Sequence, residues 1–236
     1  MRRLLFLLLV SLSLHSRSQD VPDEDQALRT DQQILRTQPQ NGTVLCACSE
    51  LSCRIGNRQT TREKKLEYFK AALDYASAAW HLDSNSSEAN VQMAFSTGRL
   101  ILLESGREKV AGAGAIKRYA ETAIRLDPHN YKAWHILGRW NYEISNLNFF
   151  ERTLAKWFYG AIPDASLKDA IREYEKSMAL RPDFMLNYLE LAKACHRDGQ
   201  DVRARQLLKQ LEALQDEMYD DRTVRSEANR LLQELN

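Results

Sequence analysis

Proline and glycine are scarce in this sequence, with 5 and 9 copies among 236 residues. A β-sandwich or β-barrel needs many tight turns, which draw on these two residues, so their scarcity argues against an all-β fold. An excess of one charge sign is also missing, because the formal net charge is +1. No overall field draws such a chain to nucleic acid, and we expect no nucleic-acid partner. With 44% apolar and 28% charged residues, the composition is that of a globular chain.

Motifs for catalysis and cofactor binding are missing as well. The sequence has no Gly-x-x-x-x-Gly-Lys-Ser/Thr phosphate loop, and its histidines lack the His-Glu-x-x-His spacing of zinc enzymes. Gly112 and Gly114 are followed by Lys117 where a dinucleotide-binding fingerprint needs a third glycine. We therefore predict no enzyme activity, no cofactor and no metal site.

Four cysteines are present, and their spacing does not match a zinc site. We expect buried thiols that pack as small apolar residues, with disulfides in an oxidising compartment as the alternative. The four are Cys46, Cys48, Cys53 and Cys195.

The N-terminus has the three parts of a secretory signal peptide. Two arginines follow the first methionine, an apolar run covers 4–14, and Ser16 and Ser18 fit a small-x-small cleavage pattern. The run has about eleven residues, whereas a membrane span needs roughly twenty. We predict a signal peptide at 1–18, a mature domain at 19–236 without a transmembrane span, and export to the periplasm or out of the cell. An uncleaved anchor is the alternative.

One spacing of small and apolar residues recurs along the chain. It places them four and then three positions apart on one helical face, shortly before a helix-ending turn. The frames are Ala72-Ala76-Ala79, Ile116-Ala120-Ala123, Ala170-Tyr174-Ser177 and Ala204-Leu208-Leu211. After two of the turns come a bulky residue, a leucine and a small residue: Trp134-x-x-Leu137-Gly138 and Tyr188-x-x-Leu191-Ala192. This pattern is typical of the tetratricopeptide repeat, whose small residues let two antiparallel helices approach closely.

We predict an all-α fold, a tetratricopeptide-like right-handed α-solenoid of about four helix pairs, with a capping helix near 222–235. Two of the three gaps between successive frames are longer than the usual ~34 residues. The first helix of a middle unit should therefore be elongated, or an extra segment should be inserted between its two helices. The largest surplus, at 145–164, is rich in aromatic residues. It is either extra core or a binding surface for a hydrophobic ligand such as a lipid tail. The stack should be concave on the side of the first helix of each pair.

Around this surplus the sequence resembles the regulator of microtubule dynamics family. The motifs are Leu137-Gly138-Arg139-Trp140-Asn141-Tyr142, Phe149-Phe150-Glu151-Arg152 and Ala155-Lys156-Trp157-Phe158-Tyr159-Gly160-Ala161-Ile162-Pro163. Here Tyr159 replaces a phenylalanine of the family pattern, and Pro163 stands where the pattern has two prolines. The resemblance covers about residues 60–235. It implies a tetratricopeptide-like domain and a non-enzymatic role, which in eukaryotic members involves microtubules, spindle poles and organelle membranes. We expect an exported homologue of bacterial type.

We therefore expect a scaffold or adaptor that binds a protein or peptide partner on its concave side. Two alternatives stay open: a carrier for a hydrophobic ligand, and a microtubule- or membrane-associated regulator if the N-terminus is an uncleaved anchor. Arg139, Arg152 and Lys156 are candidates to hold a carboxylate or phosphate, with ordinary solvated surface as the alternative. The candidate partner-binding residues are Asn90, Trp134, Arg139, Arg152, Trp157 and Tyr188.

Overall fold

The computed structural model describes residues 23–104, 107–147 and 165–235, so the predicted signal peptide lies outside the described part. Every regular element within these ranges is an α-helix, which confirms the all-α class. The helices are α1 (Glu24–Thr37), α2 (Gly42–Arg58), α3 (Arg62–Leu82), α4 (Ser87–Ile101), α5 (Arg107–Leu126), α6 (Tyr131–Ser145), α8 (Leu167–Leu180), α9 (Met185–Arg197), α10 (Asp201–Glu212) and α11 (Asp221–Glu234). None of them is long and apolar enough to cross a membrane.

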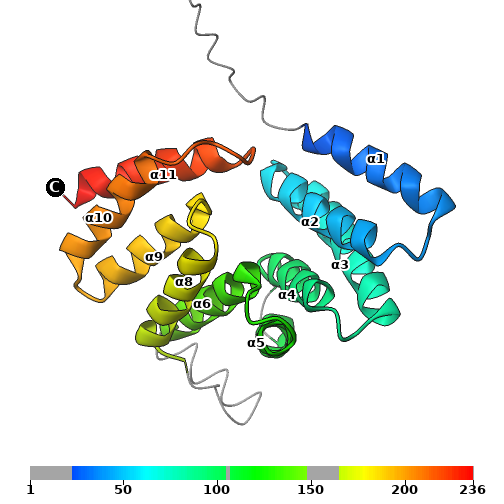
Figure 1. The fold of residues 1–236 in the computed structure, drawn as a ribbon, viewed down its shortest axis with the longest axis horizontal. Helices are drawn as coiled ribbons and strands as arrows, with labels where there is room; N and C mark the ends of the chain where they lie inside the picture. The colour runs from blue at the N-terminus through cyan, green and yellow to red at the C-terminus, as the bar shows by residue number, and fades with distance from the viewer. Residues whose placement is uncertain (1–22, 105–106, 148–164, 236) are drawn as a thin grey trace, which may run out of the picture.

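The helices pack as successive pairs (Figure 1). The pairs are α2 with α3, α4 with α5, α6 with α8, and α9 with α10. At the N-terminal end α1 covers α2, and at the C-terminal end α11 packs against α9 and α10. The predicted solenoid of about four pairs with a C-terminal capping helix is therefore confirmed within the described residues.

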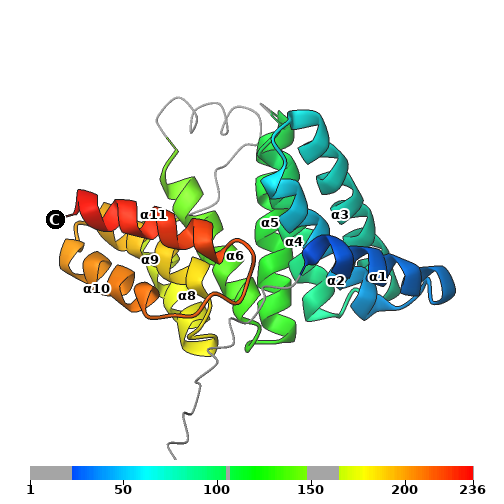
Figure 2. The same ribbon diagram turned by 90° about the horizontal axis from the view of Figure 1, so that it is seen from above.

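The stack is concave on the side of the first helix of each pair, as expected. The backbones of these inner helices approach one another in turn, α2 with α4, α4 with α6, and α6 with α9. Between the described residues of the second, outer helices there is no such approach, because the pairs fan apart on the outside. The result is the curved arrangement seen in Figure 1, with two arms that lie side by side when viewed from above in Figure 2.

Small residues form the contact between paired helices, as their spacing predicts. Ala72 and Ala76 of α3 have no exposed surface, and neither has Ala170 of α8. Gly138 of α6 is needed for close approach, because a Cβ atom there would lie 2.9 Å from Cδ1 of Tyr174 on α8. The repeat pattern therefore reports packing between helices.

Local sequence explains where the helices begin and how long they are. Asn41, Thr61, Ser86 and Ser166 each accept a backbone N–H bond from the first turn of the helix that follows, which satisfies one donor that the helix leaves unpaired. The elongated helices are the second, outer ones rather than the first, since α3 has 21 residues and α5 has 20, against 15 in each of the inner helices α4 and α6.

Candidate functional site on the inner face

Three of the predicted partner-binding residues occupy the same position in successive repeats. The side chain of Asn90 donates to the carbonyl of Ser84 at 2.8 Å, six residues earlier. Trp134 Nε1 donates to the Pro128 carbonyl in the same way, and Tyr188 Oη donates to the Pro182 carbonyl, both at 2.9 Å. Each bond ties an inner helix to the turn before it. Asn90, Trp134 and Tyr188 thus hold inter-repeat turns together, and their role in partner binding stays a prediction.

The other predicted residues divide between the inner face and the undescribed part. Arg139 lies on α6 and its side chain is 39% exposed. Arg152, Lys156 and Trp157 lie outside the described residues, as does nearly all of the aromatic surplus at 145–164. The choice between core and binding surface for that surplus is therefore still open.

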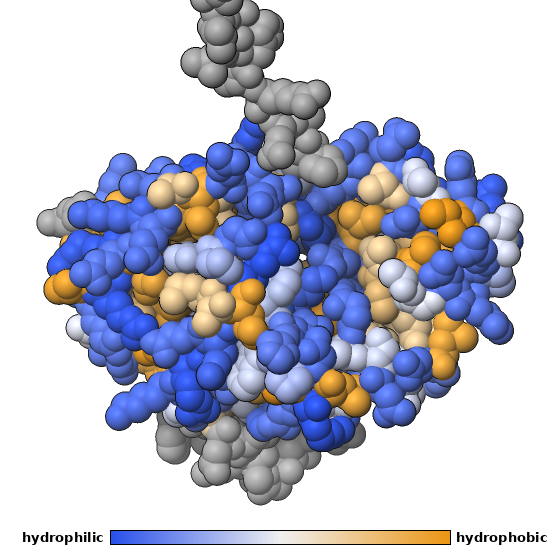
Figure 3. Space-filling model, viewed as in Figure 1, coloured by the Kyte–Doolittle hydropathy of each residue, from blue (hydrophilic) through white to orange (hydrophobic). Residues whose placement is uncertain are grey.

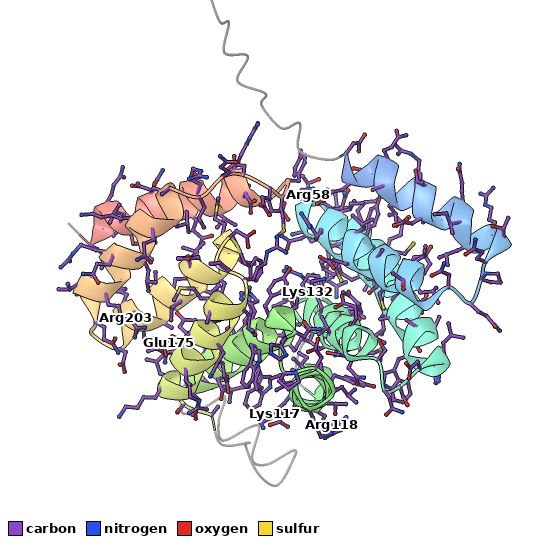
Figure 4. The ribbon with its side chains drawn as sticks, in the orientation of Figure 1. Arg58, Lys117, Arg118, Lys132, Glu175 and Arg203 are labelled. Atoms are coloured by element: carbon purple, nitrogen blue, oxygen red, sulfur yellow. The ribbon has the colours of Figure 1, made fainter. Side chains whose placement is uncertain are left out.

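Lys132 joins three inner helices through its ammonium group. Its Nζ atom lies 2.6 Å from Glu50 of α2 and 3.0 Å from Glu88 of α4, while Lys132 itself begins α6. Burial works to lower the pKa of Lys132, but the two carboxylates raise it above its ordinary value. The ammonium therefore stays charged at neutral pH and cross-links the inner row (Figure 4).

The two arms meet where α2 ends and α11 begins. Arg58 lies 2.5 Å from the buried carboxylate of Glu24 on α1, and Arg54 pairs with the same carboxylate. The Arg58 guanidinium also lies over the ring of Tyr219, 4.2 Å from its centroid, and 3.5 Å from Asp220. Figure 4 shows Arg58 at this junction. These contacts close the curved stack into a ring, with the inner helices on its inside.

Two arginines on the adjacent inner helices α4 and α6 lie near enough for their charges to interact. Arg99 of α4 donates to Asn57 at 3.2 Å and lies over the ring of Phe95, yet its Nε atom is buried without a hydrogen-bond partner. Burial lowers the pKa of Arg99 to about 10, and the charge of Arg139 lowers it further. Arg139 has one ion pair, a 3.8 Å contact with Glu143 on its own helix.

One buried carboxylate, Glu190 of α9, faces these arginines. Burial works to raise its pKa, but Arg139 and Lys193 bring it below the ordinary value. Lys193 lies 3.0 Å from Glu190 and 2.8 Å from Glu227 of α11. The centre of the ring is therefore strongly polar, and Figure 3 shows hydrophilic residues in the middle of this view between two flanks with more apolar surface.

His135 lies one helical turn from Arg139 and is neutral. Burial lowers its pKa to about 4, against an opposing hydrogen bond with Asn187. Because Asn187 donates its amide to the Tyr174 carbonyl, its Oδ1 atom accepts, and His135 Nδ1 carries the proton in the 2.9 Å bond between them. This bond links α6 to α9 and gives His135 a structural partner.

The four cysteines are all buried, as expected, and each is a free thiol. Burial raises the pKa of Cys46, Cys48 and Cys53 to about 12, so these thiols are poor nucleophiles. Within the described ranges no group of three or more His, Cys, Asp or Glu side chains could hold a metal ion. The charged side chains of the inner face can bind groups of opposite charge.

Most of this inner cluster was missed from sequence, although part of it had a usable pattern. Lys132, His135 and Arg139 are three and four positions apart, which puts them on one face of α6. That face is separate from the predicted core positions of α6. The concave side of the stack was predicted correctly. No sequence pattern marks Arg99, because its hydrogen-bond partner, Asn57, comes from another repeat.

Comparison with known proteins agrees with this architecture. The sequence profile described as Regulator of microtubule dynamics protein 1-3 matches residues 12–236. The chain belongs to the regulator of microtubule dynamics family. The match to this family begins well before residue 60, where the resemblance read from motifs began.

Relatives in the family differ in how much of their length is matched. Regulator of microtubule dynamics protein 1 of Caenorhabditis elegans is 26% identical over 202 residues, which span 84% of this chain and 89% of the relative. Regulator of microtubule dynamics protein 3 of Xenopus laevis is 28% identical over 161 residues, 68% of this chain but only 35% of the relative. The mouse protein 1 is 28% identical, and 57% of it is matched. The family's vertebrate members therefore extend well beyond the shared region.

A solved structure shows the same fold. The crystal structure of a thermophilic tetratricopeptide protein of Thermus thermophilus superimposes with a TM-score of 0.62. It covers 88% of this chain and 91% of that protein at 14% identity. The tetratricopeptide-like solenoid is thus confirmed by shape, while this identity is too low to speak about function.

Proposed function

We propose that this protein is a non-enzymatic scaffold that binds a protein or peptide segment on the inner face of its ring. The observation that carries the proposal is the charged lining of that face. Glu50, Glu88, Lys132, Arg139 and Lys193 come from four inner helices, and their side chains are between 26% and 39% exposed. Membership of a family with this fold is in keeping with a scaffold role.

Photocrosslinking tests where a partner binds. A benzoylphenylalanine at Glu143, at the edge of the inner face, should crosslink to bound peptides from a random octapeptide pool. The same group at Lys70, exposed on outer helix α3, is the matched control. Crosslinks from position 143 alone are expected. Equal yield at both positions, or none at position 143, would remove the inner face as the binding surface.

Export by the N-terminal segment remains part of the proposal, supported by the arginines, apolar run and serines of residues 1–18. Determining the first residue of the mature protein, together with its cell fraction, tests it. A chain that begins near Gln19 outside the cytosol supports an exported scaffold.

A microtubule-associated role is the second candidate, favoured by the family and by the nearly complete match to the nematode relative. It requires exposure to the cytosol. A chain that retains Met1 and faces the cytosol would argue against export and make microtubule co-sedimentation the deciding measurement.

A further inference from the structure

Arg99 and Arg139 have hydrogen-bonding capacity that the described residues of the protein do not use. A guanidinium carries five N–H donors. Arg99 uses one of them, toward Asn57, and its Nε–H is buried without an acceptor. Arg139 has only the 3.8 Å contact with Glu143, which is longer than a hydrogen bond. Buried donors are nearly always paired in folded proteins, so the hydrogen bonding of the Arg99 guanidinium is incomplete among the described residues.

The charges around the pair leave a positive excess at the centre. Arg99, Arg139 and Lys193 are faced by one buried carboxylate, Glu190, which Lys193 already contacts at 3.0 Å. Glu143 and Glu227 are 57% and 49% exposed, so water screens them from the centre. Asp220 is ion-paired with Arg58 at the junction of the arms.

We infer that Arg99 and Arg139 form an oxyanion site that receives a carboxylate side chain from an acidic peptide segment of the partner. This rests on the proposed function, since the peptide must enter the inner face. A planar guanidinium binds a carboxylate through two parallel hydrogen bonds, and the helices that carry these two arginines, α4 and α6, are neighbours on the inner face.

The surroundings favour a peptide over a lipid headgroup. The inner face belongs to a ring closed at Arg58 and Asp220, which a flat membrane surface cannot enter. An extended peptide, in contrast, can place one acidic side chain between the inner helices.

A positional-scanning octapeptide library tests the inference on the full chain. Each sublibrary fixes one position as Glu, Asp, Gln or Asn, and binding is followed by fluorescence anisotropy. The wild-type chain should bind the best fixed-Glu or fixed-Asp sublibrary at least about tenfold more tightly than its amide counterpart. Arg99→Gln and Arg139→Gln should each abolish this preference. Arg118→Gln, an exposed arginine on outer helix α5, is the matched control and should keep it (Figure 4).

The outcomes separate this inference from the proposed function. Peptide binding without acidic preference, or a preference that survives Arg99→Gln and Arg139→Gln, would overturn the oxyanion site and leave the scaffold in place. Absence of binding by every sublibrary would remove the scaffold proposal and the site with it. If Arg99→Gln does not fold, the half-exposed Arg139 carries the test together with Arg99→Lys, which keeps the charge but loses the planar fork. Arg99-dependent flotation with phosphatidylserine vesicles, without acidic-peptide preference, would assign the site to a lipid and contradict the peptide.

Discussion

Arg58, the last residue of α2, lies 3.5 Å from Asp220, the residue before α11, and this pair joins the two ends of the stack. The two side chains are 20% and 31% exposed, so solvent weakens their attraction. Ion pairs of this kind contribute less than about 1 kcal/mol. This ion pair is therefore a weak part of the closure, to which the contact of Arg58 with the Tyr219 ring also contributes.

A double-mutant cycle at this junction measures the closure. Asp220→Ala should lower the free energy of unfolding by less than about 1 kcal/mol, because only the solvent-screened pair is lost. Arg58→Ala should cost more, about 1–3 kcal/mol, because it also removes a partner of the buried Glu24 carboxylate. Urea unfolding of both single variants and the double variant gives the coupling energy. A coupling above about 2 kcal/mol would contradict a weakly closed ring.

Below neutral pH, His135 should destabilise the protein. Its pKa is about 4 in the folded chain and 6.5 ordinarily, so the unfolded chain binds the proton more tightly. Stability is lost as the pH falls from 6.5 toward 4, by about 2 kcal/mol at pH 5. In His135→Gln this loss should be absent. The comparison is made by urea unfolding at pH 7.5 and pH 5, and parallel curves for the two proteins would refute a buried neutral histidine.

Glu173 should have the opposite pH dependence. It is buried, accepts a 2.6 Å hydrogen bond from Asn141, and burial raises its pKa from 4.5 to about 7. The folded chain therefore holds the proton more tightly than the unfolded chain, and stability falls as the pH rises from 4.5 to 7. Glu173→Gln should be more stable than wild type by about 3 kcal/mol at pH 8, with the difference gone at pH 4. Thermal unfolding at both pH values checks the sign.

Gly138→Ala and Gly114→Ala should shift stability in opposite directions. At Gly138 the new Cβ atom would press on the Tyr174 ring at 2.9 Å, with an expected cost of about 1–3 kcal/mol. Near Gly114 the closest atom is the flexible end of Arg118 at 3.7 Å, so alanine should stabilise α5 by about 0.5–1 kcal/mol. Calorimetric melting of both variants tests the pair. A neutral Gly138→Ala would mean that α6 and α8 are less tightly packed than described.

The turn-closing hydrogen bonds of Trp134 and Tyr188 can be removed by phenylalanine substitutions, which keep an aromatic ring at each position. Trp134→Phe and Tyr188→Phe each leave a proline carbonyl without its donor, and each should cost about 1 kcal/mol. Since the two turns are one repeat apart, the double variant should cost the sum. Equilibrium unfolding gives the three values. If either substitution weakens partner binding while stability is unchanged, the residue acts in recognition after all.

The fold was predictable from sequence where packing demands a particular residue size. Ala72, Ala76 and Gly138 must be small for paired helices to approach, so the requirement leaves a periodic trace. The contacts of the inner face leave a weaker pattern in the sequence. Whether Arg58 meets Asp220 depends on small rotations that accumulate over all the pairs, and no local pattern records such a sum. The unpaired Nε donor of Arg99 likewise depends on how three repeats pack together.

The bonds made by Asn90, Trp134 and Tyr188 bear on how such proteins are compared. An amide, an indole and a phenol fulfil one geometric requirement, a donor that reaches the carbonyl six residues back. A sequence comparison that scores chemical similarity would treat these three positions as unrelated. It would therefore miss the repeat that contains Asn90. Divergence within this family can therefore run far at such positions, provided that each replacement keeps an N–H or O–H at the right reach.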